Sequence, residues 1–308
     1  MWLWLIQHLC LLIHYQTYTE FVQLRPTINK DLSHEKYNCF SVYPGHNWIW
    51  YISWGWHSHQ VKHYRKANHP FYDGKTIIEM IALNPSQLKR LFNTIKPISL
   101  WCFFISAPIA LFYALYISPP DYLHGDLVRI LYIHVPAAWL AVGIYTVMGL
   151  CSFASLVLRS SFYSLCAQSL ALPGCVLTVI CMLTGAIWGK PAWGTWWVWD
   201  ARLTSVVVLF FLYVGYINFC DGGLNKAASV LNVVGLINVP IIKWSVDWWF
   251  TLHQPSSFFL TKKPAIATEM LVPLLLMTVV FAGWAAAVFT RRFFVNMEAF
   301  QRRHSGIL

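Results

Sequence analysis

The chain has 308 residues, of which 57% are hydrophobic and only 11% charged, and its formal net charge is +10. A soluble domain carries about 25% charged residues, so this composition excludes an ordinary soluble protein and indicates a polytopic membrane protein. The basic residues are scattered through short segments and the C-terminal tail, so we interpret them as topology-setting charges and expect no nucleic-acid partner.

Residues 1–79 differ from the rest of the chain. They hold eight of the twelve histidines, and their apolar opening, residues 2–13, is too short to span a membrane and does not fit a signal peptide. The composition changes at Met80, where a short amphipathic lead over 81–96 begins. We expect translation to start at Met80 and residues 1–79 to be an artefact of gene prediction. A histidine-rich metal-binding extension is the less favoured alternative, because the histidines lack a repeated ligand spacing.

Six apolar stretches follow the lead, and each is long enough to cross the roughly 30 Å hydrocarbon core as a helix. They cover residues 98–117, 131–157, 163–187, 204–220, 227–244 and 267–290. The sequence therefore predicts an all-α membrane protein with a six-span domain over residues 80–308. It contains no Rossmann, phosphate-loop or helical zinc motif and no C-x-x-C-H site for covalent haem, and we interpret the cysteines of the spans as small apolar filler.

The basic residues beside the spans predict the orientation. One set of segments, which includes both ends of the six-span domain, holds nine lysines and arginines, and the opposite set holds six. Both termini are therefore expected in the cytoplasm. With six spans, residues 118–130, 188–203 and 245–266 then share the outer face, and residues 158–162 and 221–226 form short inner loops.

The three outer segments contain the unusual residues. His134 begins the second span in YIHVPAAW, with Pro136 at a position suited to the first turn of a helix. His253 follows aromatic residues in WWFTLHQP. The run WGKPAWGTWWVWDARLTS, from Trp188 to Ser205, holds five tryptophans and Asp200, and this density marks a flat aromatic surface at a membrane edge.

Two histidines beside an aromatic surface suit a non-covalently held haem, because imidazole is a strong axial ligand and indole rings stack on a flat macrocycle. Arg202, and with less support Arg129 or Lys190, is available for the propionates. If residues 193–200 form an interfacial helix, the side chains of Trp193, Trp196, Trp197 and Asp200 share one face. Asp200 is expected to cap a helix, pair with Arg202, or orient a histidine.

Each residue also has a simpler interpretation. We assign Trp139, Trp244 and Trp284 to the aromatic belt of the membrane interface, and His124 and His304 to the ordinary surface. A single histidine near the end of a span is usually a hydrogen-bonded interfacial residue. Co-location with the tryptophan run favours a ligand role for His134 and His253.

The tryptophan run closely resembles the WWD motif of haem-handling proteins of cytochrome c maturation. Together with HVPAAW, WWFTLHQP and the six spans, the chain from about Met80 onward looks like the haem exporter protein C (CcmC) family. The larger CcmF-type and CcsA-type synthases share the motif but have more spans. Residues 1–79 depart from the family pattern.

The resemblance implies a protein of the bacterial or mitochondrial inner membrane that presents haem b, held transiently and non-covalently, on the outer face. It implies His134 and His253 as axial ligands, with Trp248 and Trp249 as further aromatic contacts. It also implies transfer to the haem chaperone CcmE, with CcmAB, CcmD and membrane lipid as partners. The platform for haem and partner would consist of Trp188, Trp193, Trp196, Trp197, Trp199, Asp200 and Arg202.

Three functions are considered. The leading hypothesis is a haem-presenting module without catalytic residues. The second is a haem lyase that attaches haem covalently to the chaperone. The third is a secondary transporter, which Asn232, Asn238 and Pro240 in the fifth span would support; polar contacts between helices explain these residues more simply.

Overall fold

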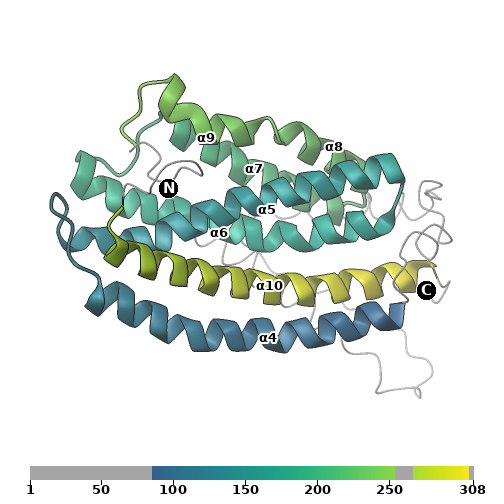
Figure 1. Cartoon of the computed structure of the whole chain (residues 1–308). Helices are drawn as coiled ribbons and strands as arrows, with labels where there is room; N and C mark the ends of the chain where they lie inside the picture. The colour runs from purple at the N-terminus through teal and green to yellow at the C-terminus, as the bar shows by residue number, and fades with distance from the viewer. Residues whose placement is uncertain (1–84, 254–265, 305–308) are drawn as a thin grey trace, which may run out of the picture. The chain divides into compact units, whose positions relative to one another are not determined.

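The computed structural model describes residues 85–253 and 266–304, which all belong to one compact unit formed by residues 57–308. The expectation for residues 1–79 lies outside the described residues. The long helices run side by side (Figure 1). In chain order the helices are α4 (Pro85–Phe112), α5 (Leu131–Leu158), α6 (Ser161–Trp193), α7 (Ala201–Asp221), α8 (Asn225–Gly235), α9 (Asn238–Trp248) and α10 (Thr268–His304), with a π-helical turn at Tyr113–Ile117 and a 3₁₀ turn at Asp126–Ile130.

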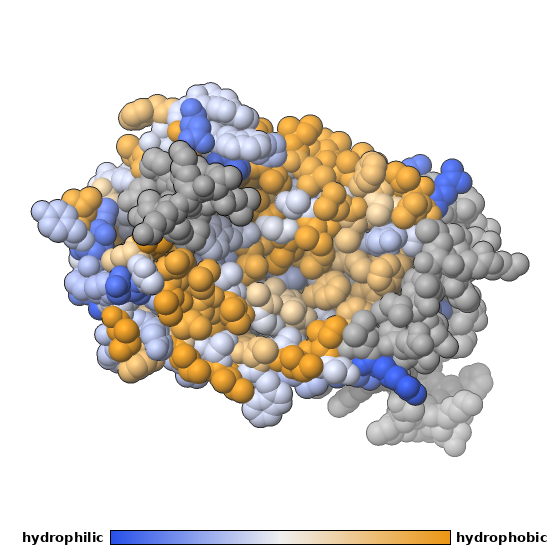
Figure 2. All heavy atoms as spheres, viewed as in Figure 1, coloured by the Kyte–Doolittle hydropathy of each residue, from blue (hydrophilic) through white to orange (hydrophobic). Residues whose placement is uncertain are grey.

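The predicted all-α membrane fold is confirmed. Six stretches are long and apolar enough to cross a membrane: Phe92–Ile117, Asp126–Leu158, Ser161–Trp193, Ala201–Asp221, Asn225–Trp248 and Thr268–Arg302. Apolar side chains cover the middle of the helices, and hydrophilic ones gather toward the two ends of the bundle (Figure 2). This is the surface expected of helices whose sides meet lipid and whose ends meet water.

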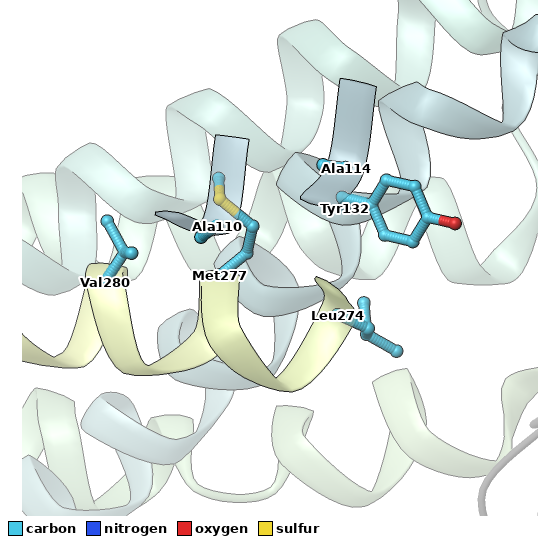
Figure 3. Close-up of a cluster of buried hydrophobic side chains, with 6 residues drawn as sticks. All are labelled: Ala110, Ala114, Tyr132, Leu274, Met277 and Val280. Atoms are coloured by element: carbon cyan, nitrogen blue, oxygen red, sulfur yellow. The ribbon is translucent and has the colours of Figure 1, made fainter. Parts of the chain in front are cut away.

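The helices pack through small residues and a few aromatic rings. α4 packs mainly on α10, and α5 packs most closely on α6. Figure 3 shows Ala110 of α4 and Ala114 of the π-helical turn near Met277 of α10, and Tyr132 of α5 belongs to the same cluster. A second cluster joins α5, α6 and α10 through residues such as Ala137 and Cys181. Small side chains let the helix backbones approach closely, and in lipid such packing replaces the hydrophobic driving force.

The fifth predicted span is two helices instead of one. α8 ends at Gly235 and α9 begins at Asn238, so Pro240 lies in the first turn of α9, where its missing amide hydrogen is tolerated. α8 packs on α5 and α7, whereas α9 packs on α7. After the break, the second half of the fifth span, α9, therefore no longer packs closely on α5.

The asparagines of the fifth span make contacts between helices, as the packing interpretation predicts. The Asn232 side-chain amide donates a 2.9 Å hydrogen bond to Ser152 Oγ on α5. The Asn238 amide donates a 2.9 Å hydrogen bond to the Ser205 carbonyl on α7. Their polar groups are thus used to join neighbouring helices.

Candidate functional site

The three segments predicted to share a face meet at one end of the bundle. The ring of His124, in the first segment, lies 5.2 Å from the ring of Trp188 in the second, centroid to centroid. Arg202, in the first turn of α7, contacts His253 in the third segment. These contacts join parts of the sequence more than 50 residues apart, so the site is assembled by the tertiary fold.

His134 lies in the first turn of α5, and α6 fixes its imidazole ring. Its Nδ1 atom is 3.0 Å from the Cys181 carbonyl oxygen and 3.1 Å from Thr184 Oγ1. A carbonyl oxygen only accepts, so Nδ1 carries the hydrogen and Nε2 keeps a free lone pair. This is the usual arrangement of a metal-binding histidine. Pro136 lies in the second turn of α5, not in the first turn as expected.

His253 follows α9, and its ring faces that of His134. The two ring centroids are 6.5 Å apart, with an angle of 35° between the ring planes. Two bonds of about 2 Å to one metal atom, with ring centres roughly 1 Å behind the bonding nitrogens, give a centroid separation of about 6 Å. Two axial imidazoles can differ in rotation about the ligand axis, so an angle of 35° between their planes is compatible with such a pair. The two histidines therefore have the spacing of axial ligands.

The two histidines are not part of a larger cluster of metal-binding side chains within the described residues. The described residues contain no group of three or more His, Cys, Asp and Glu side chains that could hold a metal ion. Structural metal sites built from protein alone usually need about four ligands. A haem iron brings four porphyrin nitrogens with it, so two facing histidines suffice for this group.

A cavity of about 570 Å³ contains both histidines. This volume falls in the usual range of pockets for small organic ligands, about 300–1,000 Å³. Its walls are mainly apolar and come from α5, α6, α7, α9 and α10, with Trp188, Trp193, Trp197, Arg202 and Lys243 beside the histidines. Trp139 also lines the cavity, and an apolar chamber with two cations and four indole rings suits a flat aromatic ligand that carries carboxylates.

Parts of the α5 and α9 walls of the cavity are also exposed. Trp139 lines it and is 37% exposed, which places this residue at the site and not merely in the aromatic belt. Gly143 and Lys243 line it as well and are exposed. The separation of α9 from α5 provides the space between these walls. Trp139 and Lys243 are site residues that the sequence analysis missed.

The tryptophan run does not form the expected interfacial helix. α6 ends at Trp193. Gly194 caps this end, and its φ of 77° is a left-handed conformation that glycine adopts easily. Residues 194–200 are irregular, so Trp193, Trp196, Trp197 and Asp200 do not share a helical face. Trp197 lines the cavity, whereas Trp196 and Trp199 are 57% and 74% exposed. The run thus has an inward part and an outward part.

Asp200 caps a helix, which was one of its three expected roles. It is the N-cap of α7, and its Oδ1 accepts a 2.7 Å hydrogen bond from the Leu203 amide. This cap fixes the start of α7 and with it the position of Arg202, two residues further on. Arg202 Nη1 lies 3.0 Å from His253 Nδ1.

The other outer basic residues lie elsewhere. Arg129 pairs with Asp126 at 2.8 Å and donates to the Ala114 carbonyl, and Lys190 donates to the Gly194 carbonyl. Neither lines the cavity. Among the described residues, Arg202 and Lys243 are the cations that line the cavity.

The remaining expected residues lie around the end of the bundle. Trp248 and Trp249 follow one another at the end of α9, are 56% and 51% exposed, and do not line the cavity. His124 is half-buried, and its Nδ1 is 3.1 Å from Asp121 Oδ2, so it is more than an ordinary surface residue. Burial acts to raise the pKa of Asp121, but hydrogen bonds from His124 and Leu123 outweigh it and lower the pKa.

Comparison with known proteins identifies the family of the chain. A family model described as heme exporter protein C matches residues 78–306. A protein of Marchantia polymorpha, described as ccmC-like, mitochondrial and of cytochrome c biosynthesis, is 44% identical over 178 residues, which are 57% of this chain and 76% of its own length. Heme exporter protein C of Haemophilus influenzae is 40% identical over 197 residues, 62% of this chain and 80% of the relative. That of Escherichia coli is 50% identical over 145 residues, 46% and 59% of the two chains. Since the family model covers most of the sequence, the chain belongs to the heme exporter protein C family of cytochrome c biogenesis.

Proposed function

We propose that the protein binds haem b non-covalently between His134 and His253, at the outer face of a bacterial or mitochondrial inner membrane, and presents it to the haem chaperone CcmE. The observation that carries this proposal is the 6.5 Å separation of the two imidazole centroids inside the cavity. In this proposal both termini are cytoplasmic, and CcmAB and CcmD are the other partners.

Different residues of the cavity bind different parts of haem. His134 and His253 bind the iron, while Trp188, Trp193 and Trp197 contact the macrocycle. Arg202 and Lys243 are the partners for the propionates. The cavity needs no nucleophile or general acid for this task, which favours a delivery protein over a haem lyase.

The exposed aromatic side chains suit a different task. Close to Trp197 in the sequence are Trp196 and Trp199, which are exposed and do not line the cavity. At the end of α9, Trp248 and Trp249 are exposed as well. Large aromatic side chains are common anchors of protein interfaces. We assign the surface of these four tryptophans to chaperone docking.

Substitution of the two histidines tests the proposal. His134→Ala and His253→Ala should each lower haem affinity at least about tenfold, because one axial bond is lost. Added imidazole should restore part of the binding by filling the vacant iron position. The measurement is the Soret band of the purified protein during haemin titration.

His124→Ala is the control, because His124 lies outside the cavity. It should retain haem. The ligand assignment is wrong if this variant loses as much haem as the other two. Absence of a Soret band from the unsubstituted protein, even after co-expression with the maturation partners, would remove the whole proposal.

A further inference from the structure

The contact between Arg202 and His253 defines the protonation of the His253 ring. Arg202 Nη1 is 3.0 Å from His253 Nδ1. A guanidinium group has donors only, so Nδ1 has to accept this hydrogen bond with its lone pair. The ring is then neutral, with its hydrogen on Nε2. This is the reverse of His134, whose Nδ1 donates to the Cys181 carbonyl.

Neither nitrogen of His253 is ready to bind a metal in this arrangement. If Nε2 is the ligand atom, it has to lose its hydrogen and Nδ1 has to gain one, and a protonated Nδ1 can no longer accept from Arg202. If Nδ1 is the ligand atom, Arg202 occupies it. Both routes require Arg202 to leave His253.

We infer that Arg202 is a latch, which holds His253 in a non-binding form until haem enters the cavity and draws the guanidinium away. The inference rests on the proposed function of His253 as an axial ligand. His134 needs no such change, so it binds the iron first and His253 follows. The ring exchanges hydrogens with water during release: Nε2 gives one up and Nδ1 takes one, with no net change in charge.

Carboxylates compete with the imidazole for the Arg202 guanidinium. Asp200 Oδ1 is used by the Leu203 amide, while Oδ2 is buried and has no hydrogen-bond partner within the described part of the chain. Asp200 and Asp247 both act electrostatically on Arg202. A haem propionate would bring a further carboxylate into the cavity. A guanidinium binds such oxygens strongly, so it gains charge-assisted hydrogen bonds by leaving the imidazole.

Nitrogen NMR of the histidine side chains tests the latch directly. The full-length protein, labelled with ¹⁵N in its histidines, is compared before and after loading with reduced haem, whose bis-histidine complex is diamagnetic. The empty protein should show a ring signal with unprotonated Nδ1 and protonated Nε2 that is absent from His253→Gln and is thereby assigned to His253. In the loaded protein the ring should have a protonated Nδ1. The His134 ring should keep a protonated Nδ1 throughout.

Loading kinetics give a second measurement. Arg202→Met removes the latch, so the association rate constant for haemin should rise roughly tenfold, as expected from the loss of one charge-assisted hydrogen bond. Dissociation should also become faster, because a propionate partner is lost. Lys190→Met is the matched control: it removes the same charge at the same end of the bundle, outside the cavity, and should leave both rates unchanged.

The outcomes separate the latch from the proposed function. A protonated Nδ1 on His253 in the empty protein, or unchanged or slower association in Arg202→Met, overturns the latch and leaves the haem site intact. A wild-type protein that shows no Soret change overturns the proposed function. The spectrum of the empty wild-type protein decides on the latch even if Arg202→Met does not fold.

Discussion

The His134 imidazole is held by a small part of α6. Its Nδ1 points to the Cys181 carbonyl and to Thr184, and Gly185 lies directly against the ring. A Cβ atom at position 185 would lie 3.0 Å from His134 Cε1, closer than an ordinary contact. The His134 ring can therefore occupy this position only because Gly185 has no side chain.

Gly185→Ala should displace the His134 ring and lower haem affinity by about tenfold, as loss of a supporting contact does in other metal sites. The helix itself should tolerate alanine, since alanine is a better helix former than glycine. Haemin titration and thermal unfolding, measured on the same samples, check these two expectations. Gly215→Ala on α7 is the control, because its Cβ meets only a Leu231 methyl group. Equal haem loss in both variants would argue against a specific role of Gly185.

The chemistry of the site could be predicted from the sequence better than its shape. His134, His253 and Arg202 stood out, because few side chains bind iron or propionates and these three fell in segments expected on one face. Trp139, Lys243 and Gly185 did not, because their importance comes from neighbours on other helices. A tryptophan near the end of a span looks the same in sequence whether it lines a cavity or faces lipid.

At the scale of elements, the tryptophan run shows where periodicity misleads. Spacings of three and four residues would place Trp193, Trp196, Trp197 and Asp200 on one face if residues 193–200 formed a helix, but Gly194 caps the end of α6 and Asp200 caps the start of α7. Both signals were visible in the sequence: glycine is common after the last turn of a helix and aspartate before the first. The irregular backbone between them lets Trp197 point inward while Trp196 and Trp199 stay exposed.

This division gives a prediction for chaperone docking. Trp196→Ala together with Trp199→Ala should weaken capture of the chaperone by the loaded protein, with little change in the Soret band. Trp197→Ala should weaken haem retention, because it removes part of the cavity wall. A pull-down with tagged chaperone and a haem titration measure the two effects. If the exposed pair loses haem while Trp197→Ala keeps it, the assignment of inner and outer tryptophans is wrong.

The break between α8 and α9 was missed because hydropathy averages over a window and does not register a helix break. Pro240 was the available signal, since it has no amide hydrogen for the Leu236 carbonyl. In the structure the Val239 amide donates to that carbonyl at 3.1 Å, and the helix restarts. An unbroken fifth span would have continued along α5 and closed the space that the cavity occupies.

At the scale of the molecule, the six spans were predictable because apolar length alone specifies them, whereas their orientation rests on charge bias. Cysteine labelling with an impermeant reagent, in a protein without native cysteines, tests the orientation. Tyr122→Cys and Lys190→Cys are exposed at the cavity end and should react from outside. Asp221→Cys and Lys226→Cys are exposed at the other end and should react only after the membrane is opened.

Ser160→Cys is a negative control for accessibility, because Ser160 is buried just before α6 and should stay unlabelled on either face. Reaction of positions 122 and 190 from opposite sides would separate the segments that the site requires on one face. Reaction of both only from the cytoplasm would instead reverse the proposed orientation and leave the cavity unchanged.

The exposed residues of the cavity wall give the bilayer a structural part in binding. Trp139 and Gly143 lie about 12 Å and 18 Å along α5 from its first residue, at a rise of about 1.5 Å per residue. At this depth in a membrane-spanning helix we expect their exposed sides to meet acyl chains, so that lipid forms part of the cavity wall. Haem affinity should then depend on the lipid beside the cavity as well as on the side chains that line it. Replacing the bilayer with detergent would therefore change part of the binding site.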